Sequence, residues 1–362
     1  MGGVLIVKKL LFVLGTRPEG IKMCPLILEA NSRRNEFSTV VINTGQHKEL
    51  VDSVFRTFGV KPEYNLGSMV HDQSLTYSLS NIICALGWQI IREESRPDYV
   101  IVQGDTTSTF AGALAGYYNK IPVVHLEAGM RSGDLYSPFP EEGNRKMVSQ
   151  ITDIHLCATE SNKENLLKEG IKDNIFVVGN TGLDAISYIS SDVEQPPINT
   201  KQKQILLTLH RREAFNSMGP VMEAVNYLSE YGGIKILFPM HPNPNLRKAV
   251  KQKLRINPNI KTIEPLDYPD FVKEMIKADI ILTDSGGVQE EAPFLGKPVI
   301  VLREKTERSE TLGKSSFMYG FNKNKILYKV MDILNNDTKF EPDYSYGDGK
   351  SSKKICDILS NK

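Results

Sequence analysis

Short aliphatic runs alternate with helical patterns along the first half of the chain. The apolar runs predict strands at residues 10–14, 40–44, 99–103, 123–126, 154–158 and 175–178. Between them, apolar positions that recur about every three to four residues predict helices, among them 75–92 and 107–118. Each run has the length expected for a strand buried on both faces, and small or charged residues follow it before the next helical pattern begins. The pattern is that of a repeated strand–helix unit.

The second half repeats this pattern after a break. Residues 187–204 contain Pro196-Pro197 and show neither a helical nor a strand period. Strands are then predicted at 204–209, 235–240, 260–263, 280–283 and 298–302, and helices at 221–231, 246–254, 271–277 and 354–359. We therefore expect an α/β protein with two doubly wound Rossmann-like domains, residues 1–186 and 187–345, facing a central cleft. The closing helix, in residues 346–362, is expected to pack back on the N-terminal domain.

Composition narrows the class of protein. The chain has 362 residues, enough for two domains, and its 44 basic and 43 acidic residues leave a net charge of +1. So balanced a charge gives no reason to expect nucleic acid or a membrane surface as a partner. The cysteines are scattered without metal-binding or redox spacing, no apolar run approaches the roughly 20 residues of a membrane span, and the start lacks the features of a signal peptide. We expect a cytoplasmic enzyme.

Chemistry-bearing residues gather where the predicted strands end. The strand at 123–126 leads into a loop dense in carboxylates and arginines, and Glu141 and Glu142 open the next helix. Matching polar clusters follow other strands, at 15–22, 104–109, 210–213 and 284–291. Ligands of an open parallel sheet bind beyond the carboxyl ends of its strands, so acid/base groups would meet a ligand there. A single such loop could be a solvated surface laced with ion pairs, but the recurrence favours a site.

These blocks, in this order, closely resemble the non-hydrolysing UDP-N-acetylglucosamine 2-epimerases. The resemblance runs in register from about residue 10 to about residue 308 and rests on the blocks Gly15-Thr16-Arg17-Pro18-Glu19, Gly104-Asp105-Thr106, His125-Leu126-Glu127-Ala128-Gly129-Met130-Arg131-Ser132, Pro140-Glu141-Glu142-Gly143-Asn144-Arg145, His210-Arg211-Arg212-Glu213 and Thr283-Asp284-Ser285-Gly286-Gly287. It implies a glycosyltransferase-B-like fold, a homodimer, and interconversion of UDP-GlcNAc and UDP-ManNAc with no cofactor and no metal.

The chemistry that the resemblance implies explains the residue types. The C2 proton of the sugar is not acidic, so the family is understood to break the C1–O bond first or in concert. UDP then leaves 2-acetamidoglucal in the site and adds back as a proton reaches the opposite face of C2. This route needs carboxyl groups on both faces of C2, and cationic or helix-terminal groups for the diphosphate. It also needs domains that close over the intermediate.

The resemblance assigns a role to each matching residue. Asp105, Glu127 and Glu141 would be the acid/base carboxylates, and His210 the catalytic histidine at the diphosphate. Glycines before a helix let backbone N–H groups reach phosphate oxygens. The substrate-binding set is Arg17, Lys22, Arg145, Leu266, Phe271, Ser285, Gly286, Gly287, Glu291 and Arg308, in which Glu291 would hold the ribose and Leu266 and Phe271 the uracil.

Other interpretations of these residues stay open on the sequence alone. The carboxylates could cap helices or pair with Arg17, Arg131 and Arg145. Lys22 could be a solvated helix residue, and Phe271 an ordinary core aromatic. Residues 285–287 could form a simple tight turn.

Two departures from the family pattern carry consequences. Ser309 follows Thr306-Glu307-Arg308 where the family has proline, which leaves the placing of Arg308 open. Asp72 stands near Gln73, where members activated by a second UDP-GlcNAc carry an arginine, although Gln46-His47 is present. An acid facing a diphosphate repels it, so activation by substrate is not expected here.

Competing functions remain to be separated. A hydrolysing epimerase would release ManNAc and UDP, but the relatives of that kind lack these blocks as they stand here. A glycosyltransferase of the same architecture would need an acceptor groove. A nucleotide-sugar binding module would have no use for carboxylates placed against an anionic ligand. A 2-epimerase acting on a related UDP-2-acetamido sugar is the remaining alternative.

Overall fold

The structure, a computed structural model, describes residues 7–46, 48–67, 73–92, 96–191, 193, 202–210 and 217–362. The chain divides into two compact units. The N-terminal unit combines Met1–Tyr188 with Tyr346–Lys362, and the C-terminal unit is Ile189–Ser345. Within the described ranges, no helix is long and apolar enough to cross a membrane. His47, Asp72 and residues 211–213 lie outside the described residues.

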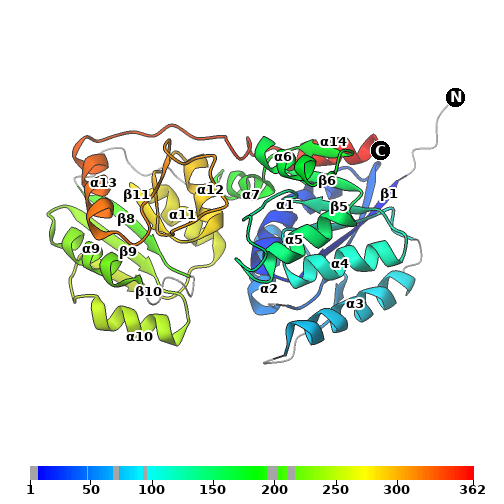
Figure 1. Cartoon of the computed structure of the whole chain (residues 1–362), viewed down its shortest axis with the longest axis horizontal. Coiled ribbons are helices and arrows are strands. Elements are labelled where there is room, and N and C mark those ends of the chain that lie inside the picture. Colours follow the sequence, from blue (N-terminus) through cyan, green and yellow to red (C-terminus); the bar gives the residue numbers. More distant parts are fainter. Residues whose placement is uncertain are drawn as a thin grey trace. The chain divides into compact units, whose positions relative to one another are not determined.

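The N-terminal unit is built on a seven-stranded parallel sheet in the order β3-β2-β1-β4-β5-β6-β7. Apart from its last helix, this unit is the blue-to-green part of the chain in Figure 1. Its strands are β1 (Lys8–Leu14), β2 (Phe37–Asn43), β3 (Tyr64–Asn65), β4 (Tyr99–Gln103), β5 (Val123–Leu126), β6 (Ile154–Cys157) and β7 (Ile175–Val177). The strand order runs outward in both directions from β1 and β4. This pair is therefore the topological switch point, where sheets of this kind bind ligands.

Helices cover both faces of this sheet: α1 (Arg17–Ser32), α2 (Lys48–Phe58), α3 (Leu75–Arg92), α4 (Thr107–Tyr118), α5 (Glu141–Gln150), α6 (Glu160–Lys168), α7 (Thr181–Ser190) and α14 (Ser351–Ser360). Helix α4 packs closely because it presents glycine to the sheet. A Cβ at Gly112 would lie 2.8 Å from Val102 Cγ1. Helix α14 belongs here although it ends the chain, since the Asp184 carboxylate accepts the N–H groups of Ser351 and Ser352.

The C-terminal unit has a six-stranded parallel sheet in the order β10-β9-β8-β11-β12-β13. Its strands are β8 (Lys203–Thr208), β9 (Ile234–Pro239), β10 (Ile260–Ile263), β11 (Ile280–Thr283), β12 (Val299–Val301) and β13 (Ser316–Met318). Its helices are α9 (Gly219–Glu230), α10 (Pro244–Lys253), α11 (Tyr268–Lys277), α12 (Gly286–Phe294) and α13 (Lys323–Asn335). Here β8 and β11 form the switch point.

Two doubly wound parallel sheets confirm the fold class expected from the sequence. Every predicted strand is present, with its ends shifted by a few residues at most. The irregular segment between the domains was expected to begin at residue 187, but α7 continues to Ser190, so it begins after that residue. The structure adds β3 and β13, short strands of two and three residues at the sheet edges, where no apolar run marks them.

Candidate active site

The N-terminal cluster lies at the carboxyl ends of β4 and β5, which are hydrogen-bonded neighbours. Asp105 follows β4 after Gly104, and Glu127 follows β5. Glu127 has a φ of 63°, in the left-handed region that is uncommon for a residue other than glycine. Its Oε2 lies 3.6 Å from the place where a Cβ of Gly104 would stand, so the two turns are in contact.

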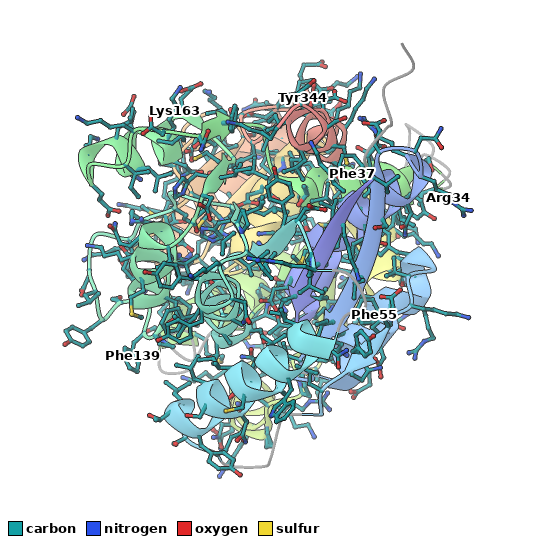
Figure 2. The ribbon with its side chains drawn as sticks, turned by 90° about the vertical axis from the view of Figure 1, so that its right-hand side faces the viewer. Arg34, Phe37, Phe55, Phe139, Lys163 and Tyr344 are labelled. Carbon is teal, nitrogen blue, oxygen red and sulfur yellow. The ribbon has the colours of Figure 1, made fainter. Side chains whose placement is uncertain are left out.

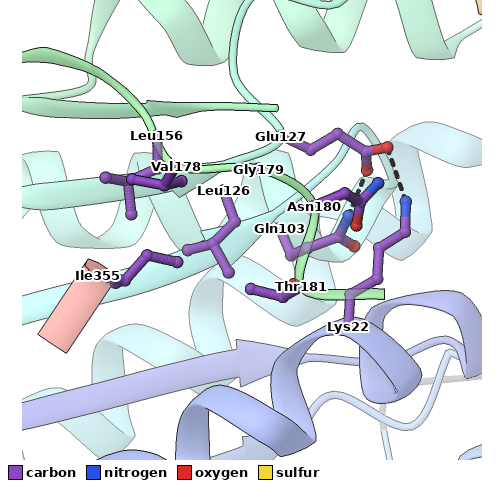
Figure 3. Close-up of a pocket in the computed structure, with 10 residues that line it drawn as sticks. All are labelled: Lys22, Gln103, Leu126, Glu127, Leu156, Val178, Gly179, Asn180, Thr181 and Ile355. Atoms are coloured by element: carbon purple, nitrogen blue, oxygen red, sulfur yellow. Dashed lines mark hydrogen bonds and ion pairs between the residues drawn. The ribbon is translucent and has the colours of Figure 1, made fainter. Parts of the chain in front are cut away.

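Glu127 is held by two side chains from neighbouring elements (Figure 3). Lys22 Nζ, on α1, lies 2.6 Å from Glu127 Oε1, and both side chains are only 11% exposed. Gln103 Nε2 donates to the other carboxylate oxygen. The pocket around them is closed by Asn180 and Thr181 and by an apolar floor that includes Ile355 of α14. Lys22 is therefore a buried partner of the carboxylate and not a solvated helix residue.

Asp105 is held from α5. Arg145 Nη2 lies 2.6 Å from Asp105 Oδ2, and Asn144 Nδ2 donates to the Asp105 carbonyl at 2.8 Å. Arg145 also contacts Glu142 Oε2 at 3.1 Å, and fully buried Glu142 accepts the Ser132 N–H at 3.0 Å. Ion pairing, one of the interpretations left open for Asp105, is thus observed with Arg145. Asn144 fixes α5 to the turn after β4 and Glu142 fixes it to the loop after β5, and the sequence assigned neither of them a role.

Glu141 is the first residue of α5 and is held differently from the other carboxylates. Its Oε2 is buried and has no hydrogen-bond partner within the described part of the chain. Buried carboxylate oxygens are almost always hydrogen-bonded, so such an atom marks a candidate acid/base group. The loop before it carries exposed aromatic side chains, and Phe139, which is 63% exposed, projects outward (Figure 2).

The arginines named as possible partners do not all join this cluster. Arg17 is the first residue of α1 and lies half-buried at the β1 end of the switch point. Arg131 instead pairs with Glu169, Nη2 to Oε2, at 2.7 Å, which fixes the loop after β5 to the end of α6. Arg131 therefore supports the loop and does not neutralise the three carboxylates.

A pair of buried histidines lies behind the carboxylates. His125 on β5 is directly opposite His155 on β6, and His125 Nε2 contacts the Gly104 carbonyl at 2.7 Å. Burial lowers the pKa of each imidazole to about 4, so both are neutral near pH 7. His125 therefore donates a hydrogen bond that holds the turn carrying Asp105. His125 belongs to one of the motif blocks, but no role was predicted for it from the sequence.

The C-terminal cluster begins at His210, directly after β8. Its backbone N–H is 3.0 and 2.9 Å from the carboxylate oxygens of Asp284, and its Nδ1 lies 3.5 Å from Asp284 Oδ1. The imidazole is 45% exposed, so it is open to a ligand. The ring of His241, which follows β9, lies edge-on to it with centroids 5.7 Å apart. Burial, followed by the charge of His210, lowers the pKa of His241. His241 was missed because it lies outside the motif blocks.

Ser285, Gly286 and Gly287 form the start of α12, with Ser285 as its N-cap residue. The Arg308 guanidinium packs on this turn, since a Cβ at Gly286 would lie 2.5 Å from Arg308 Nη1. Arg308 Nε donates to Glu290 Oε1 at 2.6 Å, and its Nη1 contacts Glu307. Despite Ser309, Arg308 thus lies beside the glycine turn, so the structure brings these predicted residues together.

Glu291, one turn along α12, accepts a hydrogen bond from the Tyr268 hydroxyl at 3.1 Å. Phe271 is half-buried on α11, and Leu266 lies half-buried just before that helix. Tyr268 had no predicted role. Within the ranges that the structure describes, no group of at least three histidine, cysteine or acidic side chains could hold a metal ion.

Paired doubly wound sheets with polar clusters at their switch points define an α/β protein of the glycosyltransferase-B-like class. The profile of the family described as UDP-N-acetylglucosamine 2-epimerase matches residues 29–360. The chain belongs to this family.

Individual relatives agree over nearly the whole length. The UDP-N-acetylglucosamine 2-epimerase of Yersinia pestis is 41% identical, with 98% of each chain covered. That of Bacillus subtilis is 40% identical, covering 97% of this chain and 94% of the relative. The crystal structure of the Neisseria meningitidis UDP-GlcNAc 2-epimerase bound to UDP-GlcNAc has a TM-score of 0.89 at 40% identity, covering 98% of this chain and 100% of that one. A spinosyn rhamnosyltransferase, 12% identical with a TM-score of 0.57, shares the fold alone.

Proposed function

We propose that this protein interconverts UDP-GlcNAc and UDP-ManNAc by inverting C2 of the sugar, without net hydrolysis. The observation that carries the proposal is the carboxylate cluster of Asp105, Glu127 and Glu141 around the ends of β4 and β5 and the start of α5. Carboxylates positioned in this way serve proton transfer, whereas simple binding of an anionic nucleotide sugar would be opposed by them. Membership of a family whose relatives carry this activity in their names supports the same conclusion.

The proposed reaction is an elimination followed by an addition. A carboxylate takes the C2 proton as the C1–O bond breaks, the electron pair of the C2–H bond forms the C1–C2 double bond, and UDP leaves. A carboxylic acid then delivers a proton to the opposite face of C2 as an oxygen of UDP bonds to C1. We assign these proton transfers to Asp105, Glu127 and Glu141. The sequence of steps returns every atom and leaves no net oxidation, so it needs neither a nicotinamide cofactor nor a metal.

The remaining groups are proposed to bind the substrate. Arg17, Lys22 and Arg145 supply cations in the N-terminal unit. In the C-terminal unit His210 and the N–H groups of the turn at residues 285–287 stabilise the leaving diphosphate, because helix N-termini favour anions. We assign Glu291 to the ribose, Leu266 and Phe271 to the uracil, and Arg308 to a further substrate contact. We add His241 to the residues proposed to contact the diphosphate, because its ring lies against that of His210.

Incubation with UDP-GlcNAc followed by proton NMR tests the proposal. The expected product is UDP-ManNAc, at equilibrium with UDP-GlcNAc and with no accumulation of free sugar. Free ManNAc with UDP as the main products would mean a hydrolysing epimerase. No change with UDP-GlcNAc, but turnover of another UDP-2-acetamido sugar, would keep the reaction and change the substrate.

A further inference from the structure

At the switch point of the N-terminal sheet lies a buried carboxylate to which the proposed mechanism gives no role. Glu19, on the first turn of α1, is 1% exposed. Its Oε2 accepts the backbone N–H groups of Gly15 at 2.9 Å and Thr16 at 2.7 Å. Its Oε1 lies 2.5 Å from the Thr106 hydroxyl and 2.9 Å from the Thr109 hydroxyl. Both oxygens are thus bonded, each to a different turn.

The contacts of Glu19 go beyond those of a helix cap. A capping box needs only the bonds between Thr16 and Glu19 at the start of α1. The bonds to Thr106 and Thr109 cross from β1 to β4, joining positions 87 and 90 residues apart in the chain. Thr106 directly follows Asp105. One side chain therefore fastens the turn that leads into Arg17 to the turn that carries an acid/base carboxylate.

Burial of the Glu19 carboxylate makes its charged form less favourable. Desolvation raises the pKa of Glu19, and the hydrogen bonds from Thr106, Gly15, Thr16 and Thr109 lower it only in part. An apolar side chain would fill the same volume without that desolvation cost, but it could not join the two turns. The buried carboxylate therefore holds the turns after β1 and β4 together at the switch point.

We propose that Glu19 is a positioning residue for the reaction, which sets the first turn of α1 relative to Asp105. This inference rests on the proposed function. Glu19 also influences the position of Glu127, because Lys22 on the same helix pairs with Glu127 at 2.6 Å. Misplacement of catalytic groups by about 1 Å can cost roughly 100-fold in rate, so loss of the link is expected to slow turnover.

Two substitutions distinguish the role of the hydrogen bonds of Glu19 from the role of its charge. In Glu19→Gln the amide oxygen can accept the Gly15 and Thr16 N–H groups, and the amide nitrogen can donate to the Thr106 and Thr109 oxygens, because hydroxyls accept as well as donate. We expect this variant to keep kcat within about fivefold of the wild type. Glu19→Ala removes the link, and we expect kcat to fall roughly 100-fold. The KM for UDP-GlcNAc should change much less, because binding groups remain in both units.

Asp184→Ala is the matched control. Asp184 is another buried carboxylate that accepts backbone N–H groups, at 3.1 Å from Ser351 and 2.7 Å from Ser352, and burial raises its pKa too. Its loss should lower the urea midpoint of unfolding about as much as Glu19→Ala does, while kcat stays within about twofold. A loss of kcat specific to position 19 therefore reports positioning and not general destabilisation.

Several outcomes would overturn the inference. A folded Glu19→Ala variant with wild-type kcat would show that the link is dispensable. A Glu19→Gln variant as slow as the alanine variant would show that the charge acts, and not the link. If Glu19→Ala does not fold, Glu19→Asp decides: it keeps the charge, but its shorter side chain cannot bond both turns, so kcat should fall about tenfold, and a wild-type kcat overturns the proposal. A wild-type protein that does not epimerise UDP-GlcNAc overturns the proposed function itself.

Discussion

At the scale of single residues, the three proposed acid/base carboxylates differ in how they are held. Asp105 faces Arg145 at 2.6 Å and Glu127 faces Lys22 at 2.6 Å, whereas Glu141 Oε2 is buried with no hydrogen-bond partner among the residues described. Removing the charge of the first two leaves a buried cation with fewer partners. Removing the charge of Glu141 leaves no paired cation behind among the residues described. Catalysis and stability should therefore respond differently at the three positions.

We predict that Asp105→Asn, Glu127→Gln and Glu141→Gln each lower kcat by roughly 10²–10⁴-fold, the usual contribution of general acid/base catalysis. The first two should also lower the free energy of unfolding by about 1–3 kcal/mol, because a hydrogen bond to a charged group is lost. Glu141→Gln should lower it less than the other two changes do, because Oε2 has no hydrogen bond to lose among the described residues. Steady-state kinetics and urea unfolding measure both effects. Near-normal rates in all three amides would show that the carboxylates serve as ion-pair partners or caps.

A second prediction at this scale concerns pH. Burial lowers the pKa of His125 from 6.5 to about 4. Between these values the unfolded chain binds a proton that the folded chain does not, so the free energy of unfolding falls as the pH drops through this window. At 1.36 kcal/mol per pKa unit, the loss contributed by His125 approaches about 3 kcal/mol below pH 4.

Urea unfolding between pH 7 and pH 4 tests this prediction with His125→Gln as the comparison. Glutamine keeps an N–H that can reach the Gly104 carbonyl, but it does not titrate. The variant should therefore lose stability less steeply than the wild type below pH 6.5. Parallel curves for the two proteins would mean that His125 is not held neutral in the fold.

At the scale of elements, the start of α12 is shaped by glycine. A Cβ at Gly286 would lie 2.5 Å from Arg308 Nη1 and 2.6 Å from its Cζ, whereas at Gly287 the nearest atom would be 3.7 Å away. Arg308 cannot withdraw freely because Glu290 and Glu307 hold its guanidinium. The two adjacent glycines therefore differ in the space available for a methyl group.

We predict that Gly286→Ala lowers the free energy of unfolding by about 1–3 kcal/mol, the usual cost of overpacking. It should also weaken UDP binding, since Arg308 and the glycine turn move. Gly287→Ala is the matched comparison and should change stability little. Thermal unfolding and calorimetric titration with UDP measure the two effects. Equal behaviour of the two variants would contradict the packing of Arg308 on Gly286.

The elements themselves could largely be predicted from the sequence. Strands such as β4, β5 and β11 are buried on both faces, so each leaves an uninterrupted aliphatic run. The edge strand β13 (Ser316–Met318) is three residues long and mixes a buried serine with an exposed methionine, so no run marks it. Its pairing with β12 is a tertiary contact that local pattern does not encode.

At the scale of the whole molecule, the sequence predicted which residues gather at strand ends but not which of them pair. Lys22 and Glu127 are 105 residues apart, and nothing local to α1 indicates that this lysine is buried against a carboxylate. The link from Glu19 to Thr109, across 90 residues, was invisible for the same reason. The pairing of β1 with β4 brings Glu19 to Thr109, and β5, the next strand in the sheet, carries Glu127 to Lys22.

The central claim, proton exchange at C2 by elimination and re-addition of UDP, is tested most directly by running the reaction in D2O. We predict that UDP-ManNAc and recovered UDP-GlcNAc acquire deuterium at C2. The carboxyl groups that donate to C2 exchange their protons with solvent, so in D2O they deliver deuterium. Mass spectrometry and the loss of the C2 proton signal in NMR measure the incorporation. UDP-ManNAc that retains the original C2 hydrogen would contradict the account.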